Sequence, residues 1–112
     1  MRVELLYTDA DPTYMRARQR LVEVLTEDAF ETTIQMVAVN SADDAELLRF
    51  PGSPTIRIDG EDIDVGAAAA PVGMGLRSYP ADEPGAPPSS VPGKRLIRTA
   101  IERARGWGHG GR

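Results

Sequence analysis

The start of the chain constrains its fold most strongly, because a short apolar segment runs through a turn directly into a long amphipathic segment. Residues Val3–Tyr7 are mostly apolar, which is typical of a strand buried on both faces. Pro12 suits the first turn of a helix, and apolar residues then recur at helical spacing, so we expect a helix from about Pro12 to about Asp28. The β-branched segment Thr32–Val39 predicts a second strand, which a right-handed crossover would place parallel to the first.

The remainder of the chain predicts two further strands and two helices. The expected elements are a helix over Ala42–Arg49, a strand over Thr55–Asp59, a fourth strand over Leu76–Tyr79 and a terminal helix over Lys94–Arg105. The rest of residues 60–93 is rich in Gly, Ala and Pro and is expected to form mobile loops. The order β-α-β-α-β-β-α predicts an α/β domain with a central mixed four-stranded sheet and helices on both faces. This domain would span residues 1–106, followed by a disordered tail over 107–112.

Length and charge narrow the class of protein. A chain of 112 residues, 41% of them apolar, suits one small domain with one core. We expect no membrane association and a cytoplasmic location, because the sequence has neither a long apolar run nor a signal peptide. Residues 1–93 carry 7 basic and 16 acidic groups (−9), and residues 94–112 carry 6 basic and 1 acidic group (+5). The acidic body argues against nucleic-acid binding. The basic end is compatible with three arrangements: a solvated helix face, contact with an acidic partner, or contact with the protein's own acidic face.

The absence of cysteine limits the chemistry of the chain. With no cysteine, disulfides, thiolate metal ligands and thiol nucleophiles are all excluded. The acidic cluster of Asp59, Glu61, Asp62 and Asp64 does not have the spacing of a calcium loop, and we expect a solvated turn there. The single histidine, His109, cannot build a zinc site alone. We therefore expect neither a metal nor a cofactor.

Residues 11–14 (Asp-Pro-Thr-Tyr) resemble the active-site segment of thioredoxin- and glutaredoxin-like proteins. Those proteins carry Cys-Pro-x-Cys between the first strand and the first helix, and Asp11 and Tyr14 hold the two cysteine positions here. A second match is residues 52–55 (Gly-Ser-Pro-Thr), directly before the third predicted strand. The resemblance implies a thioredoxin-like fold that lacks dithiol–disulfide chemistry. It also implies a cis Pro54 opposite residues 11–14, with the main chain of Ser53 offered to an extended ligand.

A narrower similarity is to small thioredoxin-like proteins, some of them alkylmercury-lyase-like. It rests on residues 52–55, on the Asp-Gly pair at 59–60 and on residues 75–79 (Gly-Leu-Arg-Ser-Tyr), where Ser78 stands at the place of a third cysteine. Carbon–mercury cleavage and disulfide exchange both need a thiolate. The resemblance therefore carries over the fold but neither activity.

These observations lead to three hypotheses about function. The first is a redox-inactive binding or adaptor protein that holds a peptide or small molecule in a groove, lined by Asp11, Pro12, Tyr14, Ser53, Pro54 and Thr55. The second is a glutathione-dependent or other non-thiol enzyme that uses the Tyr14 hydroxyl. The third is a structural subunit of a larger complex, with Trp107 and the basic tail as contacts. The plainer roles at these positions are a helix cap for Asp11 and packing for Tyr14.

No residue is assigned a catalytic role. The partner, whether protein or small molecule, is not identified by the sequence. Exposed strand edges suit either a monomer or a homodimer.

Overall fold

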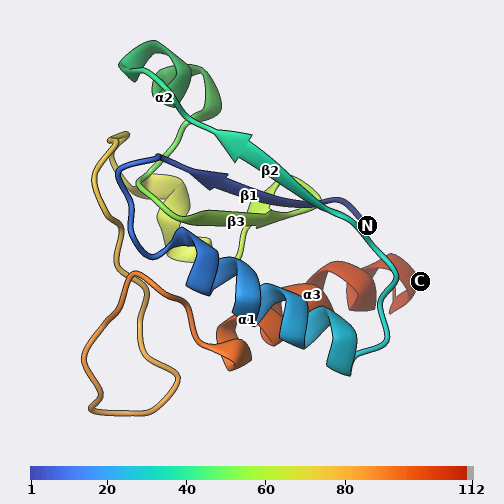
Figure 1. Ribbon diagram of the computed structural model, residues 1–112. Coiled ribbons are helices and arrows are strands. Elements are labelled where there is room, and N and C mark those ends of the chain that lie inside the picture. The colour runs from blue at the N-terminus through green and yellow to red at the C-terminus, as the bar shows by residue number, and fades with distance from the viewer. Residues whose placement is uncertain (111–112) are drawn as a thin grey trace.

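The computed structural model describes residues 1–110, with side chains for all of these except Ala68 and residues 107–110. It is an α/β fold with a four-stranded mixed sheet and three α-helices (Figure 1). In chain order, the elements are β1 (Val3–Tyr7), α1 (Tyr14–Glu27), β2 (Ile34–Ala38), α2 (Ala42–Leu48), β3 (Thr55–Ile58), β4 (Glu61–Asp62), the 3-10 helix η1 (Val65–Ala69) and α3 (Lys94–Gly110).

The sheet has the strand order β2-β1-β3-β4. β1 and β2 are parallel and are joined through α1, which confirms the pair predicted from the first three segments. β3 runs antiparallel to β1, and β4 runs antiparallel to β3. The mixed four-stranded sheet expected from the sequence is therefore present.

Helices lie on both faces of this sheet. Leu5 and Ile56 point from β1 and β3 into the main core, which α1 and α3 cover side by side (Figure 1). Leu6 points to the opposite face and packs with Ala45 of α2 and with Phe50. Side chains alternate across a strand, so one apolar strand such as β1 supplies both cores.

The fourth strand is not the one expected. Residues Leu76–Tyr79 form no strand; Leu76 and Tyr79 each make one isolated bridge, to Ser53 and Ser89 respectively. The fourth strand is instead β4, which follows β3 after the pair 59–60. This Asp-Gly pair has positive φ angles of 52° and 86°. Such a two-residue turn returns the chain at once as an antiparallel hairpin.

The element ends also differ from expectation. α1 begins at Tyr14 rather than near Pro12, and α3 extends to Gly110 rather than ending at Arg105. Residues 107–110 of the expected tail lie in the last turn of α3, and residues 111–112 lie outside the described residues. The side chains of Trp107 and His109 also lie outside the described part of the chain. None of the helices in the described part of the chain is long and apolar enough to cross a membrane.

The basic C-terminal part meets the protein's own acidic face, one of the alternatives left open by the charge pattern. Lys94 and Arg98 of α3 each lie 2.6 Å from a carboxylate oxygen of Glu27 in α1. Arg98 also lies 3.6 Å from Asp28. These pairs join the two helices that cover the same face of the sheet.

Candidate functional site

The two segments of the predicted groove are joined by a hydrogen bond between Asp11 and Ser53. The Ser53 hydroxyl donates to Oδ2 of Asp11 at 2.7 Å. The backbone N–H and the hydroxyl of Thr13 donate to Oδ1 of Asp11, at 2.7 and 2.6 Å. The Ser53 hydroxyl in turn accepts from the backbone N–H of Thr8 at 3.1 Å. Both oxygens of the carboxylate are thus used inside the protein.

This arrangement suits a positioning role for Asp11 better than a chemical one. Asp11 is only 2% exposed and Ser53 is fully buried, so neither side chain can be reached by a substrate. The local hydrogen bonds to Thr13 fix the turn that leads into α1, much as a cap residue does. The expected cap role is therefore close to what the structure has, although Thr13 rather than Asp11 is the N-cap residue of α1.

The main chain of Ser53 is already bonded within the chain. Its N–H donates to the carbonyl of Gly75 at 2.8 Å, and its carbonyl accepts from the N–H of Arg77 at 3.0 Å. Gly52 permits this close approach, because a Cβ added there would lie 2.9 Å from the Cβ of Arg77. The Ser53–Pro54 peptide bond is cis. The groups that we expected to bind an extended ligand are thus occupied by residues 75–77.

The remaining groove residues differ in exposure. Pro54 and Thr55 are buried, and the Thr55 hydroxyl donates to the carbonyl of residue 52 at 2.7 Å. Pro12 is exposed. Tyr14 is half-buried, with its ring stacked on that of Tyr7 at a centroid distance of 4.3 Å. Its hydroxyl makes no hydrogen bond within the described part of the chain, so no contact favours a catalytic role for Tyr14.

Three residues outside the predicted groove set, Asp62, Arg77 and Tyr79, form a cluster that contacts Pro54 and Thr55. Arg77 makes two hydrogen bonds to the carboxylate of Asp62, at 2.7 and 3.1 Å. The same guanidinium donates to the Thr55 hydroxyl at 3.1 Å and lies 4.1 Å from the centroid of the Tyr79 ring. The Tyr79 hydroxyl donates to the carbonyl of Pro54 at 2.7 Å.

The protonation of these groups follows from burial and from the ion pair. Burial raises the pKa of Tyr79 well above its ordinary value, so the hydroxyl stays protonated. Burial is the largest single effect and lowers the pKa of Arg77, but the hydrogen bond to Asp62 and the neighbouring negative charges together outweigh it, so the pKa is raised. Sequence reasoning missed this cluster, because the segment that contains Arg77 and Tyr79 has the local pattern of a strand.

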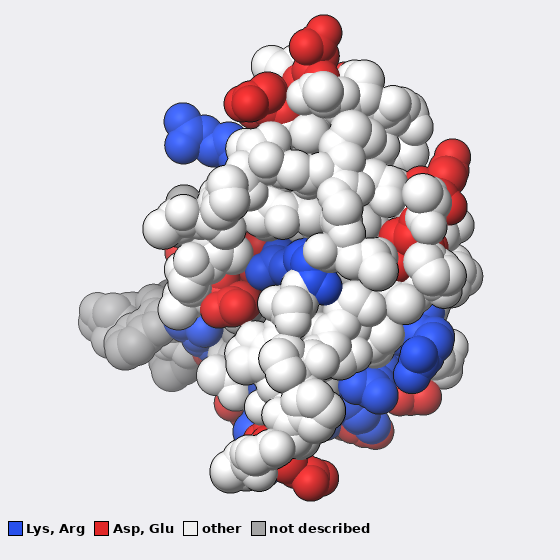
Figure 2. Space-filling view, turned by 90° about the vertical axis from the view of Figure 1, so that its left-hand side faces the viewer, with Lys and Arg blue, Asp and Glu red and all other residues white. Residues whose placement is uncertain are grey.

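The face of the molecule that contains this site carries mostly uncharged side chains (Figure 2). Figure 2 shows the side on which the loop between β1 and α1 and the segments around residues 50–54 and 70–79 lie. Uncharged side chains cover most of it, basic and acidic atoms lie side by side near its centre, and further charged side chains of both signs lie at its edges (Figure 2). Met15 and Leu76 are 54% and 59% exposed. Exposed apolar side chains therefore occur in the first turn of α1 and at Leu76, which bridges to Ser53.

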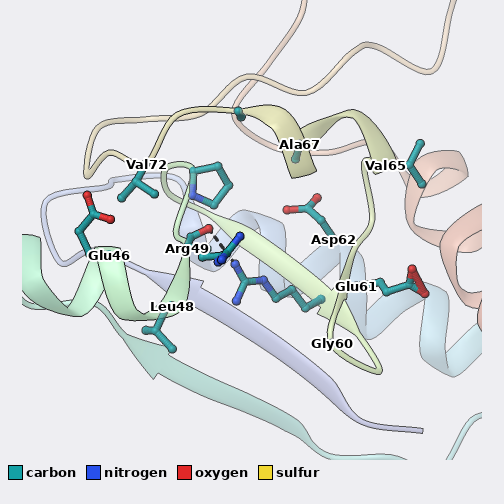
Figure 3. A pocket seen from close by; sticks show the side chains of 12 residues that line it. Glu46, Leu48, Arg49, Gly60, Glu61, Asp62, Val65, Ala67 and Val72 are labelled. Atoms are coloured by element: carbon teal, nitrogen blue, oxygen red, sulfur yellow. Dashed lines mark hydrogen bonds between the residues drawn. The ribbon is translucent and has the colours of Figure 1, made fainter.

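A separate pocket of about 680 Å³ lies between the end of α2, the β3–β4 turn and η1 (Figure 3). Arg57 lines it and donates a hydrogen bond of 3.1 Å to the carbonyl of Arg49. Three carboxylates also line it, those of Glu46, Glu61 and Asp62, so its charge is mixed and favours no single ion. None of the six predicted groove residues lines this pocket.

No protein family, curated protein or solved structure matches the chain. No group of three or more His, Cys, Asp or Glu side chains within the described residues is arranged to hold a metal ion. The chemistry of the site has to be inferred from its own residues.

Proposed function

We propose that this chain is a redox-inactive binding protein with a thioredoxin-like fold, and that it docks a protein partner on the face around Ser53. The observation that carries the proposal is the internal Asp11–Ser53 hydrogen bond beneath an open, mostly uncharged surface (Figure 2). The order of strands and helices supports the fold, because a parallel pair is joined through α1 and an antiparallel pair follows α2. The absence of cysteine excludes thiol chemistry.

The geometry favours a protein partner over a small molecule. The pockets of about 680 and 310 Å³ are both lined by other residues, so neither offers a small-molecule site beside Ser53. The main-chain groups of Ser53 are bonded to Gly75 and Arg77 and cannot orient a small ligand. Exposed apolar side chains such as Met15 and Leu76 on an open face suit contact with another protein surface.

Affinity purification from the native cell with four versions of the protein tests this proposal. The intact protein and a Leu47→Glu control are expected to retain the same partner, because Leu47 is an exposed apolar residue of α2, which packs on the opposite face of the sheet from α1. Leu76→Glu and Met15→Glu are expected to lose it, because each places a charge on the apolar surface. All three substitutions change exposed side chains, so circular dichroism should show folded proteins.

The proposal is wrong if every version retains the same proteins, or if Leu47→Glu loses them as completely as Leu76→Glu does. An insulin-reduction assay adds an independent check. We expect no turnover, since no thiolate is present.

A further inference from the structure

The outer side of β2 is an unpaired strand edge. β2 ends the sheet, and among the described residues it pairs only with β1. The N–H of Val39 donates to the carbonyl of Tyr7 at 2.8 Å. This bond shows which residues of β2 direct their peptide groups toward β1. Peptide groups alternate in direction, so the N–H and C=O groups of Ile34, Met36 and Ala38 point away from the sheet. Within the described part of the chain, no hydrogen bond reaches these outward groups.

This edge lacks the features that usually prevent pairing between molecules. The five residues Ile34–Ala38 include no charged residue and no proline. Met36 is 37% exposed, and Gln35 and Ala38 are exposed as well. The opposite edge differs, because β4 has only two residues and both are acidic. Of the two edges, β2 is the one open to a further strand.

We propose that a second copy of this chain pairs with β2, antiparallel and about a two-fold axis at Met36. In this register Met36 lies opposite Met36 of the second copy, and Ile34 lies opposite Ala38. A large side chain meets a small one at each end of the row, and no charged residue lies opposite another. The two sheets join into one of eight strands, and the outward peptide groups of both copies are bonded.

The symmetry of this register is the reason for choosing a second copy as the partner. A two-fold contact needs a patch that is complementary to itself. The row of Ile34, Met36 and Ala38 meets this condition, because the large Ile34 lies opposite the small Ala38 at both ends. A shallow pocket of about 310 Å³, lined by residues of α1 and by Thr32–Ile34, lies at the start of the same edge. The end of β2 from the second copy would lie beside it. The contact is small, so the dimer should be reversible and depend on concentration.

Analytical ultracentrifugation from micromolar to millimolar protein tests the dimer. The intact protein should shift from its 12.1 kDa mass toward twice that value as concentration rises. Met36→Lys should stay at the monomer mass, because the register would place two lysines opposite each other. Val65→Lys changes an exposed apolar residue of η1, which follows β4 at the opposite edge of the sheet, and should dimerise like the intact protein. A monomer at every concentration, or a dimer that Met36→Lys does not weaken, overturns the proposal.

Hydrogen exchange on the unmodified protein locates the contact without any variant. The amides of Gln35 and Val37 point toward β1 and should be protected at every concentration. The amides of Ile34, Met36 and Ala38 should exchange fast in dilute solution and slowly in concentrated solution. Equal exchange of these three amides at both concentrations would show that the copies do not pair along β2.

Discussion

Asp11 and Ser53 lie 42 positions apart in the sequence and share a hydrogen bond of 2.7 Å. The bond ties the turn before α1 to the segment before β3, and the N–H of Thr8 at the end of β1 joins the same hydroxyl. Under the proposed fold, Asp11 holds a position that carries a thiol in dithiol proteins. Here a buried polar network fills that position and holds the two segments together.

Replacing Asp11 with alanine should destabilise the protein by about 2–3 kcal/mol, because the buried Ser53 hydroxyl and the Thr13 donors lose their acceptor. The matched control is Asp9→Ala, since Asp9 is exposed, and its effect should stay within about 0.5 kcal/mol. Urea denaturation gives both values from the shift in midpoint. Equal midpoints for the two variants would mean that the network adds nothing to stability.

The ion pair between Asp62 and Arg77 should be strongly coupled. Its side chains are only 13% and 6% exposed, so Asp62→Ala leaves a nearly buried guanidinium without its partner and should cost about 3–5 kcal/mol. Adding Arg77→Met to Asp62→Ala should recover much of this loss, since no unpaired charge then remains. Glu61→Ala, at an exposed neighbour in β4, is the control. Urea denaturation gives the change in the free energy of unfolding for each variant. If the change in the double variant equals the sum of the changes in the two single variants, the two side chains are not coupled.

The part of the fold that the sequence predicts well depends on local periodicity. The sequence predicts the type and order of β1, α1 and β2, although not every end, because a short apolar run, a 3.6-residue pattern and a β-branched run follow one another. The parallel pairing follows from chain geometry once these elements are placed. The start of α3 at Lys94 was also correct, because Leu96, Ile97 and Ala100 form an apolar stripe.

Tertiary contacts explain what the sequence did not predict. Residues 76–79 have the local pattern of a strand, yet Tyr79 is buried by its contact with Pro54 and Arg77 by its pair with Asp62. Nothing local distinguishes that outcome from strand pairing. The occupation of the Ser53 main chain by residues 75–77 is likewise a contact between distant segments. The resemblance identified the two sides of the site but not the segment that fills it.

The contact between Glu27 of α1 and Lys94 of α3 should be detectable in the titration of the Glu27 carboxyl group. The hydrogen bond from Lys94 holds the pKa of Glu27 below its ordinary value, so its contribution to stability is present above that value and is lost as pH falls through the lowered pKa. Lys94→Met should raise the pKa of Glu27, as followed by NMR of the carboxyl group. Arg95→Met is the control, because Arg95 contacts Asp82 instead. An unchanged titration in Lys94→Met would show that the pair is absent in solution.

Stability should fall in alkaline solution because of Tyr79. This side chain is 1% exposed, and burial raises the pKa of its hydroxyl well above the ordinary value of 10.0. Above about pH 10 the unfolded state therefore loses a proton that the folded state keeps. The free energy of unfolding should then decline with a slope that approaches about 1.4 kcal/mol per pH unit from this group.

Urea denaturation between pH 8 and pH 11 measures that slope, with Tyr79→Phe as the matched variant. The variant loses the hydrogen bond to the Pro54 carbonyl and should be less stable at neutral pH, but its decline above pH 10 should be shallower by the Tyr79 contribution. Tyr7→Phe, which removes the hydroxyl of a half-buried tyrosine, is the control for the substitution itself. The same slope in Tyr79→Phe and in the intact protein would mean that Tyr79 ionises as easily in the folded state as in the unfolded chain.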